Sequence, residues 1–295
     1  MQALQKWDTI AILALSKALP LQQKTKIIQN ISSQFQQRGL HTIFYPSCFE
    51  TEYLDCPSID SRINDFHNAL QEPKIKWMMI LRWGRNSNQL LDHIDYALLK
   101  KNKKPIIGYS DITTILNAIY HKTQQCNYHG PLAIDFLEDN RINHLWKESL
   151  YQMLFSPHST IQLWDNPRYI QAWTAQGVLV WWNLTSFLQL AGTKYFPKLQ
   201  NKIIFLEDTP NTPLNFRDRA LHHLWLQKWA NQIQWILIGK TGTGHHITPQ
   251  NWEKLFSQIQ SFQNIPIIAN LDFGHIPYNQ TLIIWEKYNI QSPSQ

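Results

Sequence analysis

Three polar residues have the side chains that a nucleophilic amide hydrolase needs. Ser110, Glu207 and His275 each stand at the end of an apolar run. A serine can attack a carbonyl carbon, a histidine can take the serine's proton, and a carboxylate can orient that histidine. Spacing along the chain does not show that the three meet, and each is also an ordinary polar residue for the end of a strand.

Ser110 lies in a strand–turn–helix pattern. Ile106-Ile107 predicts the end of a buried strand, Gly108-Tyr109 a sharp turn, and the apolar spacing of 111–120 a helix. Such a junction lifts a serine hydroxyl out of the sheet and turns backbone N–H groups toward any oxyanion that it forms. The alternative is a helix N-cap, in which Ser110 or Asp111 only satisfies free backbone amides.

Strands alternate with helices through about residue 135, which predicts an α/β domain with a mainly parallel sheet. The expected strands are 9–15, 41–45, 75–81 and 106–107, and the expected helices are 22–38, 58–70, 89–101 and 111–120. Sites on parallel sheets lie at the carboxyl ends of the strands, which is where Ser110 falls.

The second half of the chain predicts a smaller, mixed α/β domain. We place an N-terminal nucleophile domain at 1–140, an irregular connection at 141–175 and a C-terminal domain at 176–295. Apolar runs in the last domain predict strands at 178–180, 203–206, 236–238 and 265–268, with helices at 216–229 and 249–261. Glu207 and His275 both fall in this domain.

Composition excludes several classes of protein. The 295 residues are 43% hydrophobic and 16% charged, which describes an ordinary globular protein of one or two domains. The net charge of +6 comes from scattered Lys and Arg, so we expect no nucleic-acid partner. The three cysteines lack metal-ligand spacing and fit a reducing compartment. The twelve histidines lack paired-ligand spacing, so we expect no metal and no other cofactor. Because the apolar run 9–15 is too short to cross a membrane, we expect a cytoplasmic protein.

Several motifs together resemble the LD-carboxypeptidase family of serine peptidases, which includes murein tetrapeptide carboxypeptidases and microcin C self-immunity peptidases. The motifs are Pro105–Thr113 with His129-Gly130-Pro131, Ile204–Asp208 with Asp218-Arg219, Phe273-Gly274-His275, Asn88–Leu91 with Ile94-Asp95-Tyr96, and Asn183-Leu184 with Leu190–Thr193. The resemblance extends from about residue 4 to residue 284.

The resemblance implies a site in the cleft between an N-terminal nucleophile domain and a C-terminal domain. It makes Ser110 the nucleophile, His275 the general base and Glu207 the carboxylate partner of that base. It also implies an oxyanion hole built from the backbone amides of Asp111 and Gly84. Preorganised donors of this kind stabilise a tetrahedral intermediate by several kcal/mol, so their geometry matters as much as the triad.

Asn86-Ser87-Asn88 resembles the microcin-immunity branch of the family. These side chains are candidates for binding a substrate carboxylate or amide, and the alternative is that they hold their own loop through bonds to the backbone. The function implied is hydrolysis of an amide bond in a small peptide, in peptidoglycan recycling or microcin immunity, by a protein that we expect to be a homodimer. The alternative is an inactive family member that binds peptides or has a structural role.

Tryptophan stands at several places where the family has glycine. The chain has 13 Trp and only 10 Gly. The clearer positions are Trp7, Trp83, Trp181, Trp182, Trp235 and Trp285. We interpret the repeated exchange as UGA codons that some bacteria read as glycine and that are translated here as tryptophan. On this hypothesis the chain as given is inactive and less stable than its glycine form, whereas the alternative is a relative whose cleft has been filled.

Overall fold

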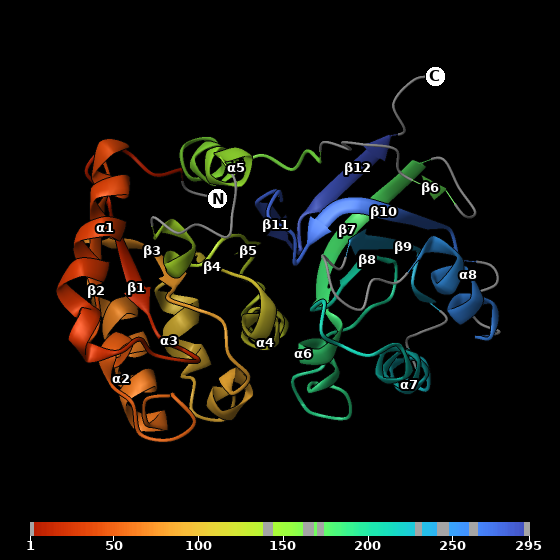
Figure 1. The fold of residues 1–295 in the computed structure, drawn as a ribbon, viewed down its shortest axis with the longest axis horizontal. Helices are drawn as coiled ribbons and strands as arrows, with labels where there is room; N and C mark the ends of the chain where they lie inside the picture. Colours follow the sequence, from red (N-terminus) through yellow and green to blue (C-terminus); the bar gives the residue numbers. More distant parts are fainter. Residues whose placement is uncertain are drawn as a thin grey trace.

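The computed structural model describes residues 3–137, 144–161, 168–169, 174–227, 232–240, 248–259 and 265–291. Two α/β domains lie side by side, each built on a six-stranded sheet (Figure 1). The N-terminal sheet is mostly parallel and the C-terminal sheet is mixed. This architecture confirms the fold class predicted from the sequence. No helix in the described part of the chain is long and apolar enough to span a membrane.

The N-terminal sheet brings the carboxyl ends of neighbouring strands together. Its strands are β1 (Thr9–Leu13), β2 (His41–Phe44), β3 (Ile75–Ile80), β4 (Ile106–Gly108), β5 (Asn127–His129) and β11 (Leu282–Ile284). The helices are α1 (Lys24–Gln37), α2 (Ile59–Gln71), α3 (Tyr96–Lys101) and α4 (Thr113–Thr123). The strand order is β11-β5-β4-β3-β1-β2. The chain leaves β1 toward β2 on one side and leaves β3 toward β4 on the other, so the loops after β1 and β3 diverge. Such a switch point commonly binds ligands in α/β sheets.

The helix expected over 89–101 is shorter than the prediction. Ser87–Leu90 forms a 3-10 turn, and α3 begins only at Tyr96. The Asp95 carboxylate accepts hydrogen bonds from the backbone N–H groups of Ala97 and Leu98, both at 2.9 Å. This capping carboxylate starts the helix, and apolar spacing alone did not indicate it.

The connection expected at 141–175 contains a helix. Helix α5 (His144–Phe155) packs its buried side chains on the N-terminal domain, and Leu4 N–H donates to Leu154 O at 2.8 Å. Its buried residues include Tyr151 and Met153 as well as Leu150 and Leu154, so they do not form one narrow stripe. The sequence therefore lacked a clear helical period there. Residues 162–167 and 170–173 lie outside the described residues.

The C-terminal sheet has four parallel inner strands with an antiparallel strand at each edge. Its order is β12-β7-β8-β9-β10-β6. The strands are β6 (Arg168–Tyr169), β7 (Thr174–Asn183), β8 (Lys202–Glu207), β9 (Trp235–Lys240), β10 (Ile267–Gly274) and β12 (Lys287–Gln291). The helices are α6 (Leu184–Leu188), α7 (Leu214–Trp225) and α8 (Pro249–Ser257). The predicted runs fall within or beside β7 to β10, and β8 ends on a polar residue of the candidate site.

The two domains share a strand and a helix interface. Strand β11 lies within the segment assigned to the C-terminal domain, yet it pairs antiparallel with β5 of the N-terminal sheet, with Leu282 opposite His129. Helix α4 faces α6 across the interface, where Thr114 Oγ1 donates to Ser186 O at 3.1 Å (Figure 1). The chain thus crosses back to the first domain beyond His275, which ties the two halves of the site together.

Candidate active site

Ser110 stands at a strained turn between β4 and α4. Tyr109 is extended, and Ser110 opens a 3-10 turn that leads into α4. The φ angle of Ser110 is 65°, in a left-handed region that costs a non-glycine residue about 1–3 kcal/mol. An ordinary N-cap residue has extended backbone instead. The strain therefore favours the interpretation of a nucleophile turn over that of a helix cap.

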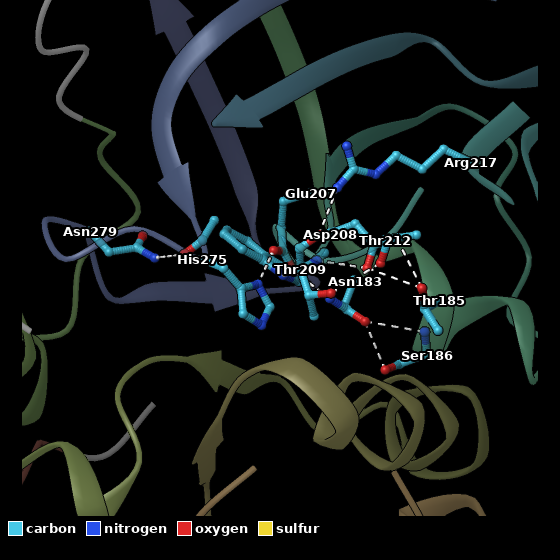
Figure 2. Close-up of polar contacts among 12 residues, drawn as sticks. Asn183, Thr185, Ser186, Glu207, Asp208, Thr209, Thr212, Arg217, His275 and Asn279 are labelled. Atoms are coloured by element: carbon cyan, nitrogen blue, oxygen red, sulfur yellow. Dashed lines mark hydrogen bonds and ion pairs between the residues drawn. The ribbon is translucent and has the colours of Figure 1, made fainter. Parts of the chain in front are cut away.

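Glu207 and His275 form a hydrogen-bonded pair at the carboxyl edge of the C-terminal sheet. Glu207 is the last residue of β8, His275 follows β10, and His275 Nδ1 lies 2.6 Å from Glu207 Oε2. The carboxylate is fully buried, whereas the imidazole is 15% exposed. Figure 2 shows the ring directed away from its own sheet and toward the N-terminal domain. With Nδ1 held by the carboxylate, Nε2 is the nitrogen that can exchange a proton with a nucleophile.

The pKa of His275 results from two opposing influences. Burial disfavours the charged imidazolium, but the charge of Glu207 and its hydrogen bond favour it more strongly, so the pKa of His275 is raised. A histidine of this kind accepts a proton more readily than a free imidazole. This is the behaviour that a general base requires when the imidazolium forms during the reaction.

The turn before His275 requires glycine. Gly274 has a φ of 117°, and a Cβ atom at this position would collide with the carbonyl oxygen of Lys240 on β9. Asn279 Nδ2 donates to Gly274 O at 2.6 Å from the other side. The motif Phe273-Gly274-His275 thus has a physical reason, since Gly274 lets β10 turn beside β9 and present the imidazole.

Asn183 holds the second oxygen of Glu207. Asn183 Nδ2 donates to Glu207 Oε1 at 3.1 Å, while its Oδ1 accepts from Ser186 N–H and Ser186 Oγ at 3.2 and 2.8 Å (Figure 2). One side chain therefore caps α6 and orients the carboxylate. The sequence singled out Asn183 only as part of a family motif, and the available signal was an asparagine between a strand and a helix.

A second buried carboxylate lies beside Glu207 and has separate partners. Asp208 accepts from Thr185 Oγ1 at 2.9 Å and from Thr209 N–H at 2.7 Å. Burial, followed by the charge of Glu207, raises the pKa of Asp208 against these hydrogen bonds and the nearby Arg217 charge. Arg217 is fully buried and donates to Thr209 O at 2.6 Å, which fixes the loop after β8 (Figure 2). The sequence had pointed to the neighbouring pair Asp218-Arg219, not to this arginine.

The loop after β3 packs against the nucleophile turn. A Cβ atom at Gly84 would collide with Ser16 Oγ, so this position also requires glycine. Ser87 is fully buried; its N–H donates to Asp111 Oδ2 at 3.0 Å and its Oγ to Asp111 O at 2.8 Å. Ser87 thus holds the loop, as in the alternative left open by the sequence, whereas Asn86 is half-buried and Asn88 is exposed.

Trp181 occupies the space between Glu207 and the N-terminal domain. Its ring stacks on His129 of β5 with centroids 3.3 Å apart, and its Nε1 donates to Glu207 Oε1 at 3.3 Å. Aromatic pairs prefer centroid separations of roughly 4.5–7 Å, so this contact is crowded. Burial, then the charge of His275, lowers the pKa of His129 well below its usual value and keeps that ring neutral. The side chain of Trp182 lies outside the described residues.

The two halves of the candidate triad come from opposite domains and face one shared region. The ring of Tyr109, next to Ser110, lies with its centroid 5.3 Å from that of His275. Within the described ranges, no group of three or more His, Cys, Asp or Glu is placed to hold a metal ion. The arrangement therefore offers a strained serine, a histidine–carboxylate pair and buried backbone turns.

Comparison with known proteins gives the family. Models of the LD-carboxypeptidase N-terminal and C-terminal domains match residues 10–130 and 176–290. The chain belongs to the LD-carboxypeptidase family. A putative carboxypeptidase of Treponema pallidum is 33% identical over 270 residues, which covers 85% of this chain and 80% of that protein. These findings confirm the resemblance seen in the motifs and make the chain a member of a family of serine-type carboxypeptidases.

Solved structures of relatives share the fold. An MccF-like protein from Bacillus anthracis has a TM-score of 0.88 and 28% identity, over 99% of this chain and 95% of that chain. The microcin C7 self-immunity protein MccF, in complex with aspartyl sulfamoyl adenosine, has a TM-score of 0.84 and 22% identity, over 99% and 98% of the two chains. A muramoyltetrapeptide carboxypeptidase from Oxalobacter formigenes also shares the fold, with a TM-score of 0.81 and 21% identity over 97% of this chain and 95% of that chain.

Proposed function

We propose that the protein hydrolyses an amide bond in a small peptide through Ser110, His275 and Glu207. The observation that carries the proposal is the buried Glu207–His275 pair, facing the domain in which Ser110 is held at positive φ. Asn183 supports the pair from behind. Membership of the LD-carboxypeptidase family agrees with this chemistry.

In the proposed cycle, Ser110 Oγ attacks the scissile carbonyl carbon while His275 Nε2 takes the hydroxyl proton. The negative charge that develops on the carbonyl oxygen is stabilised by the backbone N–H groups of Asp111 and Gly84. His275 then gives its proton to the leaving amine, and an ester to Ser110 remains. A water molecule, deprotonated by His275, hydrolyses this ester and releases the acid and the free serine.

Two substrate classes fit the proposal. A relative from Pseudomonas aeruginosa is a murein tetrapeptide carboxypeptidase, and MccF has been solved with an aminoacyl-nucleotide analogue. Asn86 and Asn88, beside the nucleophile turn, are the candidates to bind a substrate carboxylate or amide. We infer that the microcin-like class is the better fit, because the loop Asn86-Ser87-Asn88 resembles the microcin-immunity branch and MccF proteins share the fold. A cytoplasmic, homodimeric protein is part of the same proposal.

The second candidate function is peptide binding without catalysis. It is favoured by Trp181, whose indole fills the space next to Glu207 and His129. A filled cleft would still allow a peptide to bind at the rim of the domain interface.

Substitution of the nucleophile separates the two candidates. Ser110→Ala should abolish hydrolysis of a murein tetrapeptide or an aminoacyl sulfamoyl adenosine, since loss of a triad nucleophile costs about 10⁶ in kcat. The measurement is release of the two hydrolysis products by chromatography, in the chain with tryptophan and in the form with glycine at the six tryptophan positions. Turnover that persists near the parental rate in Ser110→Ala would contradict the proposed mechanism, and binding without turnover in either form would favour the second candidate.

A further inference from the structure

The Asp111 carboxylate joins loops that follow three adjacent strands. It is 1% exposed, and Oδ2 accepts from Ser16 Oγ at 2.6 Å and from Ser87 N–H at 3.0 Å. Ser16 lies in the loop after β1, Ser87 in the loop after β3, and Asp111 itself follows β4. Since β4, β3 and β1 are neighbours in the sheet, a single oxygen links all three carboxyl-terminal loops.

The same contacts hold Gly84 in place. The Ser16 hydroxyl that donates to Asp111 packs directly against the Cα of Gly84, where a Cβ atom would have no room. Three residues later, Ser87 is bound twice, by the carboxylate and by the Asp111 carbonyl. The turn that contains Gly84 is therefore fixed at both ends by Asp111.

A buried arginine holds these loops from the opposite side. Arg62 is 1% exposed, and its Nη1 donates to Leu15 O at 3.4 Å and to Asn86 O at 3.3 Å. These carbonyls belong to the residues just before Ser16 and Ser87. Burial lowers the pKa of Arg62, while Cys56 and then Asp111 act to raise it. Burial raises the pKa of the Asp111 carboxyl, against the hydrogen bonds from Ser16 and Ser87.

We propose that the Asp111 side chain is a positioning residue that sets the separation of the two backbone donors of the oxyanion hole. The inference rests on the proposed function. One donor is the Asp111 N–H itself, and the other is the Gly84 N–H, whose position the carboxylate controls through Ser16 and Ser87. Oxyanion donors act only when they lie about 2.7–3.1 Å from the developing charge, so a small shift of one loop weakens catalysis.

The test is Asp111→Ala, which removes the oxygen that accepts both bonds. Ser16 Oγ–H and Ser87 N–H then both lose their acceptor. We expect kcat to fall about 10–100-fold with KM changed less than about threefold, because the donors act on the transition state and not on bound substrate. Ser16→Ala should lower kcat in the same direction by a smaller factor.

Asp65→Ala is the matched control. Asp65 is also a buried carboxylate, 6% exposed, but it accepts from Ser47 N–H at 2.7 Å, in the turn after β2 and not in the nucleophile turn. It should lower the thermal midpoint to a similar extent and leave kcat within about twofold of the parent. An equal loss of kcat in Asp65→Ala and Asp111→Ala, or an unchanged kcat in Asp111→Ala, would overturn the inference.

The kinetic comparison uses the full chain, either with tryptophan or with glycine at the six positions. The form chosen is the one that hydrolyses substrate and loses this activity in Ser110→Ala. If neither form shows such hydrolysis, the proposed function fails. The positioning role of Asp111 is then tested by amide hydrogen exchange. Asp111→Ala should then speed exchange at residues 84–87 about tenfold or more, and Asp65→Ala should not. Unchanged exchange in Asp111→Ala would overturn the positioning role by itself.

Discussion

The pKa of His275 is set by Glu207, and this gives a prediction with a defined sign. Because the folded-state pKa is raised above 6.5, the stability that the charged pair contributes is present below pH 6.5 and is lost as the pH rises through the folded pKa. Catalysis has the opposite dependence, since the base must be neutral. We expect the acidic limb of the kcat/KM profile to lie above pH 6.5.

Glu207→Gln should lower the pKa of His275 and reduce kcat about 10⁴-fold, as in triads whose carboxylate is replaced by an amide. The pKa is measured by following the His275 ring proton by NMR in a Ser110→Ala background, which does not depend on turnover. The same His275 pKa in the presence and absence of the Glu207→Gln substitution would contradict the electrostatic role assigned to this pair.

Backbone angles at single residues bear on the tryptophan positions. Trp7 and Trp285 have φ angles of 72° and 68°, and both are among the six positions where the family has glycine. Positive φ favours glycine because a side chain with a Cβ atom is strained there. Trp83, Trp181 and Trp235 are not among the described residues with positive φ, so for them the case rests on the motif and, at Trp181, on crowding.

We therefore predict UGA at these six codons, with UGG at some of the other tryptophans. Sequencing the gene decides the matter directly. UGG at most of the six positions would contradict the decoding hypothesis and favour a relative with a filled cleft.

At the scale of elements, Asn183 has two functions that different substitutions separate. Asn183→Ser keeps an N-cap for α6 but loses the bond to Glu207, whereas Asn183→Ala loses both. The alanine variant should be less stable than the serine variant by about 1 kcal/mol, the usual value of an N-cap, while both should lose activity to a similar extent. Thermal midpoints and kcat of the two variants test this, and full activity in Asn183→Ser would contradict a role in orienting Glu207.

The sequence predicted the elements that have strong local signals and missed those set by distant partners. Apolar runs indicated β4 and β8, and Ser110 and Glu207 at their ends needed only strand–turn patterns and the family motifs. Strand β11 was not predicted because its pairing joins Leu282 to His129, far apart in the chain. The roles of Asn183 and of the Asp111 side chain were missed for the same reason, since they depend on contacts between separate loops.

At the scale of the whole molecule, two hydrogen bonds and one ring stack connect the domains next to the candidate site. Trp285 Nε1 donates to Asn117 Oδ1 at 2.9 Å, Asn117 Nδ2 donates to Trp181 O at 3.2 Å, and Trp285 stacks on Tyr120 with centroids 4.0 Å apart. Trp285 is 4% exposed and Trp181 2%. The interface thus includes two of the tryptophans for which glycine is expected, Trp181 and Trp285.

These contacts change the expectation for stability. Relief of positive φ at Trp285 is worth about 1–3 kcal/mol, but removal of a buried tryptophan side chain costs about 3–5 kcal/mol. Trp7 is 61% exposed and its ring contacts that of His41 at a centroid separation of 5.5 Å, so little burial opposes the strain term there. We therefore expect Trp7→Gly to raise the thermal midpoint, and Trp285→Gly and Trp181→Gly to lower it. From the sequence we expected the glycine form to be more stable. This should hold for glycine at the exposed Trp7 turn but not for glycine at the domain interface.

Activity should change in the opposite direction from stability at Trp181. Trp181→Gly removes the indole that lies on His129 and leaves Glu207 with its bonds to His275 and Asn183, so it should open the site although it loosens the interface. We expect no turnover in the chain as given, and turnover that requires Ser110 once all six positions are glycine. Thermal midpoints and amine release, measured side by side for the single and combined variants, provide the test. Turnover by the chain as given, abolished by Ser110→Ala, would show that the cleft accommodates the indole and that Trp181 does not block it.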